Sequence, residues 1–329
     1  MKALVLGAPG LLGSNLVRAL LQKGYSVRAF RRRGKNSPTL EGLPIEMAEG
    51  DFTDKGSLLQ ALEGCDYLFH AGPYFPLRTL PVDEAISRGL ADVKTVMVAA
   101  EEKGIRRIVY TSTLFQIGPP RVAGELADET CPFETSFRRN PYLMAKQAME
   151  EEVKRRADRG LPVVIVNPTA FFGPYDSRPT SGTQILMIAR GQMPAYVEGP
   201  LNVIDVRDVA VGEVLALERG RVGERYILGN SNTTQGELNA LIARWALVSP
   251  PRLKVPWGLA RFGARMGEKA MSLLHRDPPI PSFFVEALYH FQHYNCTKAI
   301  QELGLPQNPV EGAIRDALTW FREHRYLTV

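Results

Sequence analysis

The stretch MKALVLGAPGLLGSNLVRALLQKGYSVRAFRRR, residues 1–33, constrains the fold of this chain more than any other. A short apolar run leads into Gly7, Gly10 and Gly13, and leucines at helical spacing follow. This order predicts a strand, a tight turn, a helix and a second strand. Glycines let a pyrophosphate approach the turn, and the N–H groups of a following helix stabilise its charge. The stretch therefore predicts a dinucleotide-binding turn that includes Leu11 and Leu12, against the alternative of an ordinary glycine-rich turn.

The same alternation of strand and helix continues as far as Pro168. Strands are predicted at residues 45–51, 65–72, 105–113 and 161–168, and helices at 54–64, 84–104 and 141–159. Strands that alternate with helices indicate a parallel sheet with right-handed crossovers. We therefore expect a Rossmann-like, doubly wound α/β fold.

Regular alternation weakens after Pro168, and the segment from about Thr233 onward is mainly helical in pattern. We expect residues 1–168 to form the dinucleotide-binding domain, with 201–230 returning to it through a strand at 224–229. Residues 169–200 and 231–329 are then the substrate-binding region. No flexible linker separates the two regions, so we expect them to pack as one unit.

Composition excludes several classes of function. The 329 residues carry a formal charge of +5 and a pI near 9.1, but basic and acidic residues are interspersed, so we expect no nucleic-acid partner. Three scattered cysteines predict neither a disulfide framework nor a metal site, and His290 with His293 lacks a third ligand. Without a long apolar run we expect no membrane insertion and a cytoplasmic protein.

Arginines follow the second predicted strand, where an NAD site usually carries an acidic residue for the ribose 2′-hydroxyl. Arg31, Arg32 and Arg33 stand there instead, and guanidinium groups suit a 2′-phosphate. This favours NADP(H) over NAD(H), although NAD(H) stays possible. We also assign to the cofactor site residues near the ends of the later strands: Asp51, Phe52, His70, Ala71, Gly72 and Pro168.

Tyr142 and Lys146 occur four residues apart on a predicted helix, in the stretch YLMAK. Residues at that spacing share one helix face, so the lysine could favour ionisation of the phenol. The alternative is an ordinary pair on a helix surface, and the spacing alone does not decide between them.

The glycine triplet, GDFTD at 50–54, VYTST at 109–113, YLMAK and Gly173-Pro174 together resemble the extended short-chain dehydrogenase/reductase (NAD-dependent epimerase/dehydratase) family. Segments such as LPVVIVNPTAFFGPYDSRPTSG are similar to the dihydroflavonol 4-reductase-like branch, close to bacterial hopanoid-associated sugar epimerases. The resemblance implies that Tyr142 is the general acid/base and that Lys146 lowers its pKa and holds the nicotinamide ribose. Thr113, with Ser112 as the alternative, would hydrogen-bond the substrate oxygen. The resemblance also makes a homodimer possible.

Several positions depart from the family pattern. Pro9 replaces a common Thr or Ser, and Gly89-Leu90-Ala91-Asp92-Val93 stands where Asn-Val-x-Gly-Thr is frequent, which puts a water relay through that Asn in doubt. Members acting on nucleotide sugars carry Arg-x-x-Asn-x-Tyr-Gly-Pro, and here Asn167, Ala170 and Phe172 occupy the Arg, Asn and Tyr places. This argues against a standard UDP-sugar substrate.

Aromatic residues near the strand ends could line an apolar substrate pocket, although core packing is an equally good reading of them. They are Tyr74, Phe75, Phe115, Phe171 and Phe172. We therefore expect an NADP(H)-dependent reductase of a ketone or aldehyde on a small, partly apolar substrate. A sugar epimerase or dehydratase is the alternative, and a cofactor-binding sensor without turnover is a third hypothesis.

Overall fold

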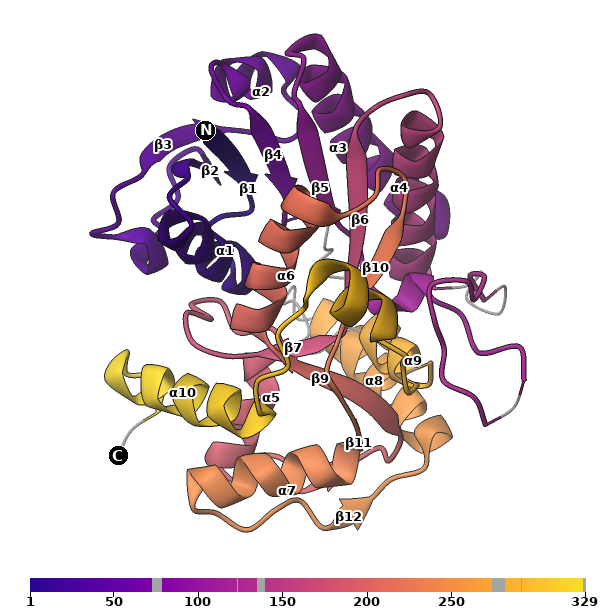
Figure 1. Ribbon diagram of the computed structural model, residues 1–329. Helices are drawn as coiled ribbons and strands as arrows, with labels where there is room; N and C mark the ends of the chain where they lie inside the picture. Colours follow the sequence, from indigo (N-terminus) through magenta and orange to yellow (C-terminus); the bar gives the residue numbers. More distant parts are fainter. Residues whose placement is uncertain (73–78, 123, 135–139, 274–281, 291, 328–329) are drawn as a thin grey trace.

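A computed structural model describes the chain except residues 73–78, 123, 135–139, 274–281, 291 and 328–329 (Figure 1). Its centre is a seven-stranded parallel sheet in the order β10-β6-β5-β4-β1-β2-β3. The strands are β1 (Lys2–Leu6), β2 (Ser26–Arg32), β3 (Glu46–Gly50), β4 (Tyr67–His70), β5 (Arg107–Thr111), β6 (Val163–Pro168) and β10 (Arg225–Leu228). The doubly wound α/β fold predicted from the alternating pattern is confirmed.

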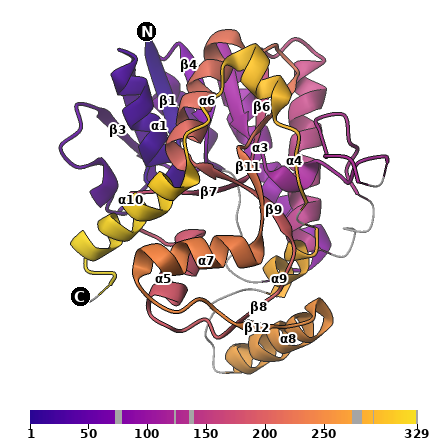
Figure 2. The ribbon, with the colours of Figure 1, turned by 60° about the horizontal axis from the view of Figure 1, so that its bottom comes forward.

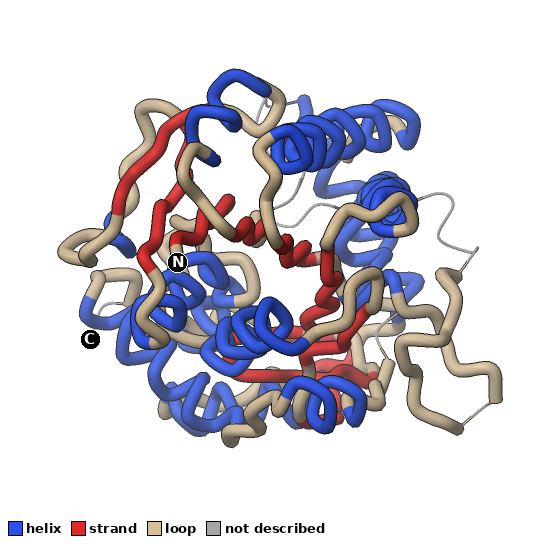
Figure 3. Tube along the Cα trace, turned by 45° about the horizontal axis from the view of Figure 1, so that its top comes forward, coloured by secondary structure: helices blue, strands red, loops and turns tan. Residues whose placement is uncertain are grey.

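Helices cover both faces of this sheet, as the red strands between blue helices in Figure 3 show. One face packs against α1 (Leu11–Gln22) and α6 (Val206–Arg219), and the other against α2 (Lys55–Leu62), α3 (Val82–Glu102) and α4 (Pro141–Ala157). Alternate residues of each strand enter the two apolar layers: Val5 lies with α1 and Leu4 with α3. Burial on both faces explains the near-continuous apolar runs of these strands.

A smaller lobe lies beyond the carboxyl ends of the central strands (Figures 1 and 2). It contains a three-stranded sheet in the order β11-β9-β7 and the two-stranded pair β12-β8. The strands are β7 (Ala170–Phe172), β8 (Ala195–Tyr196), β9 (Pro200–Asp205), β11 (Ser231–Thr234) and β12 (Leu253–Lys254). The helices are α5 (Gly182–Ala189), α7 (Gln235–Ala246), α8 (Trp257–Leu273), α9 (Ser282–Leu288) and α10 (Val310–Glu323).

Three short helical turns complete the described elements: η1 (Pro38–Leu40), η2 (Leu114–Gln116) and η4 (Ala299–Leu303). The strand predicted at residues 224–229 is β10, which joins the central sheet beside β6. Helix α6 packs on α1. Residues 201–205 instead form β9 of the smaller lobe. The sequence pattern after Thr233 predicts mainly helices and did not predict β12, because a two-residue strand leaves no periodic signal.

The strand order reverses between β1 and β4. From β1 the chain proceeds outward through β2 and β3, and from β4 it proceeds to the other side through β5 and β6. In open α/β folds ligands bind at the carboxyl edge of the sheet, at the point where the strand order reverses. The candidate site is built around this point.

Candidate functional site

The turn after β1 depends on glycine. Gly7 has a φ of +82°, and a Cβ there would lie 2.5 Å from the Cα of Gly72, at the end of β4. A Cβ on Gly13 would lie 2.1 Å from the carbonyl oxygen of Gly7. Both contacts are backbone, so neither can yield to a side chain. The two glycines therefore let the turn fold tightly against α1 and the end of β4.

Gly10 caps the N-terminus of α1 without any side-chain cap, and its N–H donates to the Gly7 carbonyl at 3.0 Å. A Cβ on Gly10 would meet only that same carbonyl, at 3.3 Å. The first N–H groups of a helix, here those of Leu11 and Leu12, have no acceptor within the helix. Open N–H groups at a turn free of side chains fit the pyrophosphate of a dinucleotide.

The three arginines after β2 have different partners. Arg31 donates to Glu49 at 2.9 and 2.6 Å, and Arg33 lies 3.9 Å from Asp54. Arg32 is exposed. Hydrogen bonds from Thr53 lower the pKa of Asp51, and the Arg32 charge adds to this shift. Burial raises the pKa of Asp92, and the Arg32 charge opposes that rise. Arg32 is therefore an exposed cation near Asp51 and Asp92, whereas Arg31 is paired with Glu49 of the neighbouring strand β3.

Phe52, which follows β3, and His70, at the end of β4, pack against each other. The Phe52 ring lies 5.7 Å from those of both Phe30 and His70, and His70 lies 5.5 Å from Tyr110. Neither ring nitrogen of His70 has a hydrogen-bond partner in the described part of the chain, and burial lowers the pKa of His70 to about 3, with the nearby Lys146 charge adding to the shift. His70 is thus a neutral, buried ring at physiological pH.

Ala71 and Pro168, also predicted for the cofactor site, lie at the carboxyl edge of the central sheet. The Ala71 N–H donates to the Leu6 carbonyl at 3.0 Å and so continues the pairing of β4 with β1. Pro168 ends β6 and is buried opposite Leu228. The glycine turn, Arg32, Asp51 and these strand ends lie along one edge of the sheet, where dinucleotides bind in folds of this kind.

Helix α4 begins at a cap that fixes Tyr142. The Asn140 side chain accepts from the Leu143 N–H at 3.1 Å and donates to the Phe283 carbonyl at 2.8 Å, and Pro141 occupies the first helical turn. Tyr142 and Lys146 lie on the same helix face, both nearly buried, with the ammonium 5.8 Å from the centre of the phenol ring.

Burial has the largest effect on the electrostatics of this pair. It raises the pKa of Tyr142 to about 12, and a hydrogen bond with Thr113 opposes this rise. Burial also lowers the pKa of Lys146 to about 7, against the attraction of Asp92 and Glu150. Burial is thus the largest influence on both pKa values, and the expectation that Lys146 lowers the tyrosine pKa stays a prediction.

Two adjacent hydroxyls after β5 have separate partners. Thr113 hydrogen-bonds the Tyr142 phenol, whereas Ser112 donates to the buried Glu150 carboxylate at 2.5 Å. The Asn167 amide donates to the backbone carbonyl of Thr113 at 3.0 Å and to the Glu150 carboxylate at 3.1 Å, so it links the two partners' surroundings. Of the two hydroxyls, Thr113 is the one beside the phenol.

Comparison with known proteins agrees with this geometry. The model of the NAD dependent epimerase/dehydratase family matches residues 3–229. This chain belongs to that family. It is 38% identical over 328 residues to the "Putative dihydroflavonol 4-reductase" of Synechocystis sp., covering 98% of this chain and 95% of the relative. It is 35% identical to "Sterol demethylase protein B" of Methylococcus capsulatus, covering 98% and 99%.

Solved structures agree in fold. The crystal structure of gox2253 has a TM-score of 0.86 at 34% identity and covers 99% of both chains. A nucleoside-diphosphate-sugar epimerase from Pseudomonas aeruginosa has a TM-score of 0.83 at 28% identity, covering 100% of this chain and 99% of that one. The resemblance to the extended short-chain dehydrogenase/reductase family is thereby confirmed, and the chain is an enzyme of the NAD-dependent epimerase/dehydratase family.

Two carboxylates near Lys146 were missed from the sequence. Glu150 lies one turn further along α4, and its spacing of four from Lys146 was a usable signal. Asp92, on α3, stands where the family often has Gly, and burial with the nearby Asp51 raises its pKa to about 6. Its charge acts on Lys146 across the packing of α3 on α4, which is close at Gly89, where a Cβ would lie 2.9 Å from the Met149 sulfur.

The aromatic residues proposed for the substrate have mixed surroundings. Tyr74 and Phe75 lie outside the described residues. Phe115 is buried in the apolar cluster that contains Tyr142, and Phe171 is half-buried against the main core. Phe172 is buried in the core of the smaller lobe, which matches the core-packing reading.

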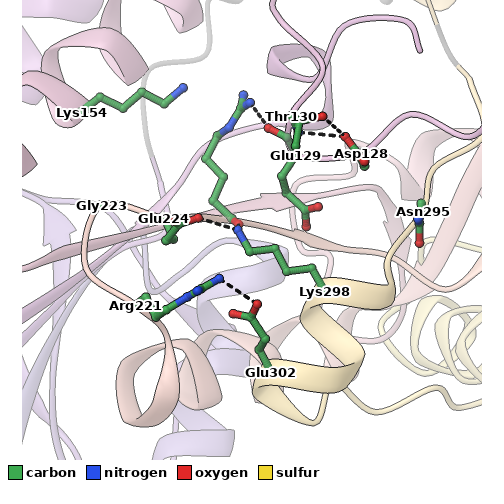
Figure 4. Close-up of a pocket in the computed structure, with 11 residues that line it drawn as sticks. Asp128, Glu129, Thr130, Lys154, Arg221, Gly223, Glu224, Asn295, Lys298 and Glu302 are labelled. Atoms are coloured by element: carbon green, nitrogen blue, oxygen red, sulfur yellow. Dashed lines mark hydrogen bonds and ion pairs between the residues drawn. The ribbon is translucent and has the colours of Figure 1, made fainter. Parts of the chain in front are cut away.

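A cavity of about 430 Å³ is lined by residues that include Glu129, Lys154 and Lys298 (Figure 4). Its cations have partners: Lys298 donates to Glu224 at 2.7 Å, and Arg221 to Glu302 at 2.7 Å. Lys154, at its rim, lies 2.8 Å from Glu150. The described residues contain no group of three or more potential metal ligands and no helix long and apolar enough to cross a membrane.

Proposed function

We propose that this protein is an NADP(H)-dependent reductase of a ketone or aldehyde carried on a partly apolar body. The observation that carries the proposal is the Tyr142 phenol, hydrogen-bonded by Thr113 and adjacent to Lys146 at the carboxyl edge of the central sheet. The surroundings of the phenol are apolar, since Phe283 lies 5.4 Å away and Phe115 belongs to the same buried cluster.

In the proposed reaction NADPH supplies a hydride to the carbonyl carbon. Tyr142 donates its proton to the carbonyl oxygen, which becomes the product hydroxyl, and Thr113 hydrogen-bonds that oxygen beforehand. A phenol whose pKa is about 12 keeps its proton throughout the physiological range, so it is available as an acid. Lys146 would hold the nicotinamide ribose and return a proton to the phenolate.

Three features favour reduction over epimerisation. Ala170 replaces the Asn that positions sugar nucleotides, Arg32 is an exposed cation suited to a 2′-phosphate, and relatives covering nearly the whole chain include one named as a reductase. The epimerase alternative draws support from the Pseudomonas aeruginosa epimerase, which covers all of this chain. A homodimer and residence in the cytoplasm stay predictions.

The function can be tested with purified protein. Mass spectrometry of nucleotide released on denaturation comes first, followed by titration with NADPH and NADH and by a carbonyl panel that includes bulky apolar ketones. Exchangeable NADPH and its oxidation by at least one apolar carbonyl would support the reductase. Retained NAD, with no net oxidation of NADPH on any substrate, would favour the epimerase instead.

A further inference from the structure

Helix α8 presents an exposed apolar stripe to the surroundings. Leu259, Phe262, Met266 and Leu273 are 61%, 63%, 50% and 83% exposed. Their spacing of three, four and seven residues places them on one face of the helix. Figure 2 shows α8 at the periphery of the molecule, beside α9 and the β8–β12 pair. Exposed large apolar residues gathered on one helix face mark an interaction site.

The opposite face of α8 is attached to the protein by polar contacts. The Trp257 indole donates to the Val285 carbonyl at 3.3 Å, and Arg261 donates to Glu286 at 3.1 Å. Glu268 accepts from the backbone N–H of Thr79 at 3.2 Å. The helix is therefore fixed by its polar side, and the apolar stripe faces away from the protein.

Cations border the stripe. Arg265 and Lys269 each follow a stripe residue by three positions, Phe262 and Met266 respectively, and both are exposed. Arg265 is paired with Glu286 at 2.5 Å but stays 52% exposed at its side chain. The single carboxylate of α8 is Glu268, which faces inward. The outward surface of α8 is thus apolar and cationic, and α8 itself carries no carboxylate there, although Arg265 is paired with Glu286 of α9.

We propose that α8 is an interfacial helix that lies on an anionic phospholipid surface. Leucine, phenylalanine and methionine side chains would enter the boundary between head groups and acyl chains, and Arg265 and Lys269 would meet the lipid phosphates. The opposed polar and apolar sides, and the absence of outward acids on α8, favour a lipid surface over a second copy of this basic chain.

The proposed surface lies close to the candidate site. Helix α8 packs on α9, and α9 carries Phe283, whose ring lies 5.4 Å from that of Tyr142. An apolar substrate that partitions into lipid would therefore be concentrated one helix away from the phenol. Binding to the surface itself does not depend on the proposed reductase activity.

The proposal is tested by sedimentation of the full chain with vesicles of phosphatidylcholine alone and of phosphatidylcholine with phosphatidylglycerol. We expect binding to the anionic vesicles that weakens with salt. The triple substitution Leu259→Ser, Phe262→Ser and Met266→Ser should reduce partitioning at least about tenfold. Val222→Ser, at another apolar residue that is 48% exposed, is the matched control and should bind as the unaltered chain does.

Charge is tested separately. Lys269→Gln should reduce binding to anionic vesicles roughly fivefold and leave thermal stability unchanged, because the residue is exposed. Absence of vesicle binding by the unaltered chain, or equal binding by the triple variant, would overturn the proposal. So would sedimentation velocity without lipid in which the unaltered chain is a dimer and the triple variant a monomer, since a second copy would then cover the stripe.

Discussion

The Ser112 hydroxyl donates to the buried Glu150 carboxylate at 2.5 Å. Thr113, one residue further, hydrogen-bonds the phenol. Adjacent hydroxyls at the end of one strand thus have two different tasks. One satisfies a buried acid, and the other is placed where a substrate oxygen would meet the phenol.

We expect Thr113→Ala and Ser112→Ala to separate these tasks. Thr113→Ala should lower kcat by roughly 10- to 100-fold with little change in melting temperature, because it removes a hydrogen bond at the reacting oxygen. Ser112→Ala leaves Glu150 with one donor fewer and should cost about 1–3 kcal/mol of stability. Turnover at saturating substrate and thermal melts of both variants check this. The same loss of kcat in both would contradict the division.

Tyr142→Phe should lower turnover by about 10²–10⁴-fold and leave NADPH binding intact, since the phenol supplies the proton in the proposed reaction. Tyr110→Phe is a matched control, because its buried hydroxyl has no hydrogen-bond partner in the described part of the chain. Its removal should leave turnover nearly unchanged. Stopped-flow rates and fluorescence titrations measure the two effects, and full turnover in Tyr142→Phe would reject the assignment.

Local geometry explains what the sequence could predict. Gly7 and Gly13 are needed by a turn of a few residues, and Tyr142 with Lys146 share a helix face through spacing alone. Each pattern lies within one short segment, so it can be identified before the fold is known. The same holds for the parallel sheet, whose buried strands are continuous apolar runs.

Tertiary packing explains what the sequence could not predict. The Asp92 charge acts on Lys146 because α3 packs closely against α4 near Gly89, and no pattern in either helix reveals that approach. The choice between Ser112 and Thr113 likewise depends on Glu150 entering from α4. The pKa values could not be expected either, because burial, rather than the neighbouring charge, dominates both Tyr142 and Lys146.

The pH dependence of kcat/KM should report Lys146, whose pKa in the free protein is about 7. Above that pH the ammonium loses its proton and its proposed role, so kcat/KM should fall on the alkaline side. Because Asp92 raises this pKa, Asp92→Asn should move the alkaline limb to lower pH, by roughly one unit. Asp158→Asn, at an exposed position at the end of α4, is the control and should leave the limb in place.

Arg32→Glu should weaken NADPH binding by roughly 10- to 100-fold, because it replaces a cation suited to the 2′-phosphate with an anion. NADH binding should change little. Arg31→Gln is the comparison, since Arg31 is already paired with Glu49 and should contribute less. Fluorescence titrations with NADPH and NADH measure the affinities. An equal loss of NADPH affinity in the two variants would show that the arginines contribute only general positive charge.

Glu213 should make stability depend on pH. It is fully buried on α6, accepts a hydrogen bond from Thr111 at 2.5 Å, and burial raises its pKa to about 8. The folded state therefore retains a proton that the unfolded chain releases near pH 4–5, so stability falls as pH rises from about 4.5 towards 8. Glu213→Gln removes this dependence and should be more stable than the unaltered chain at pH 7.5, by on the order of 3 kcal/mol, but similar at pH 5. Denaturant unfolding at both pH values checks this, and an unchanged difference would mean that Glu213 is ionised in the folded protein.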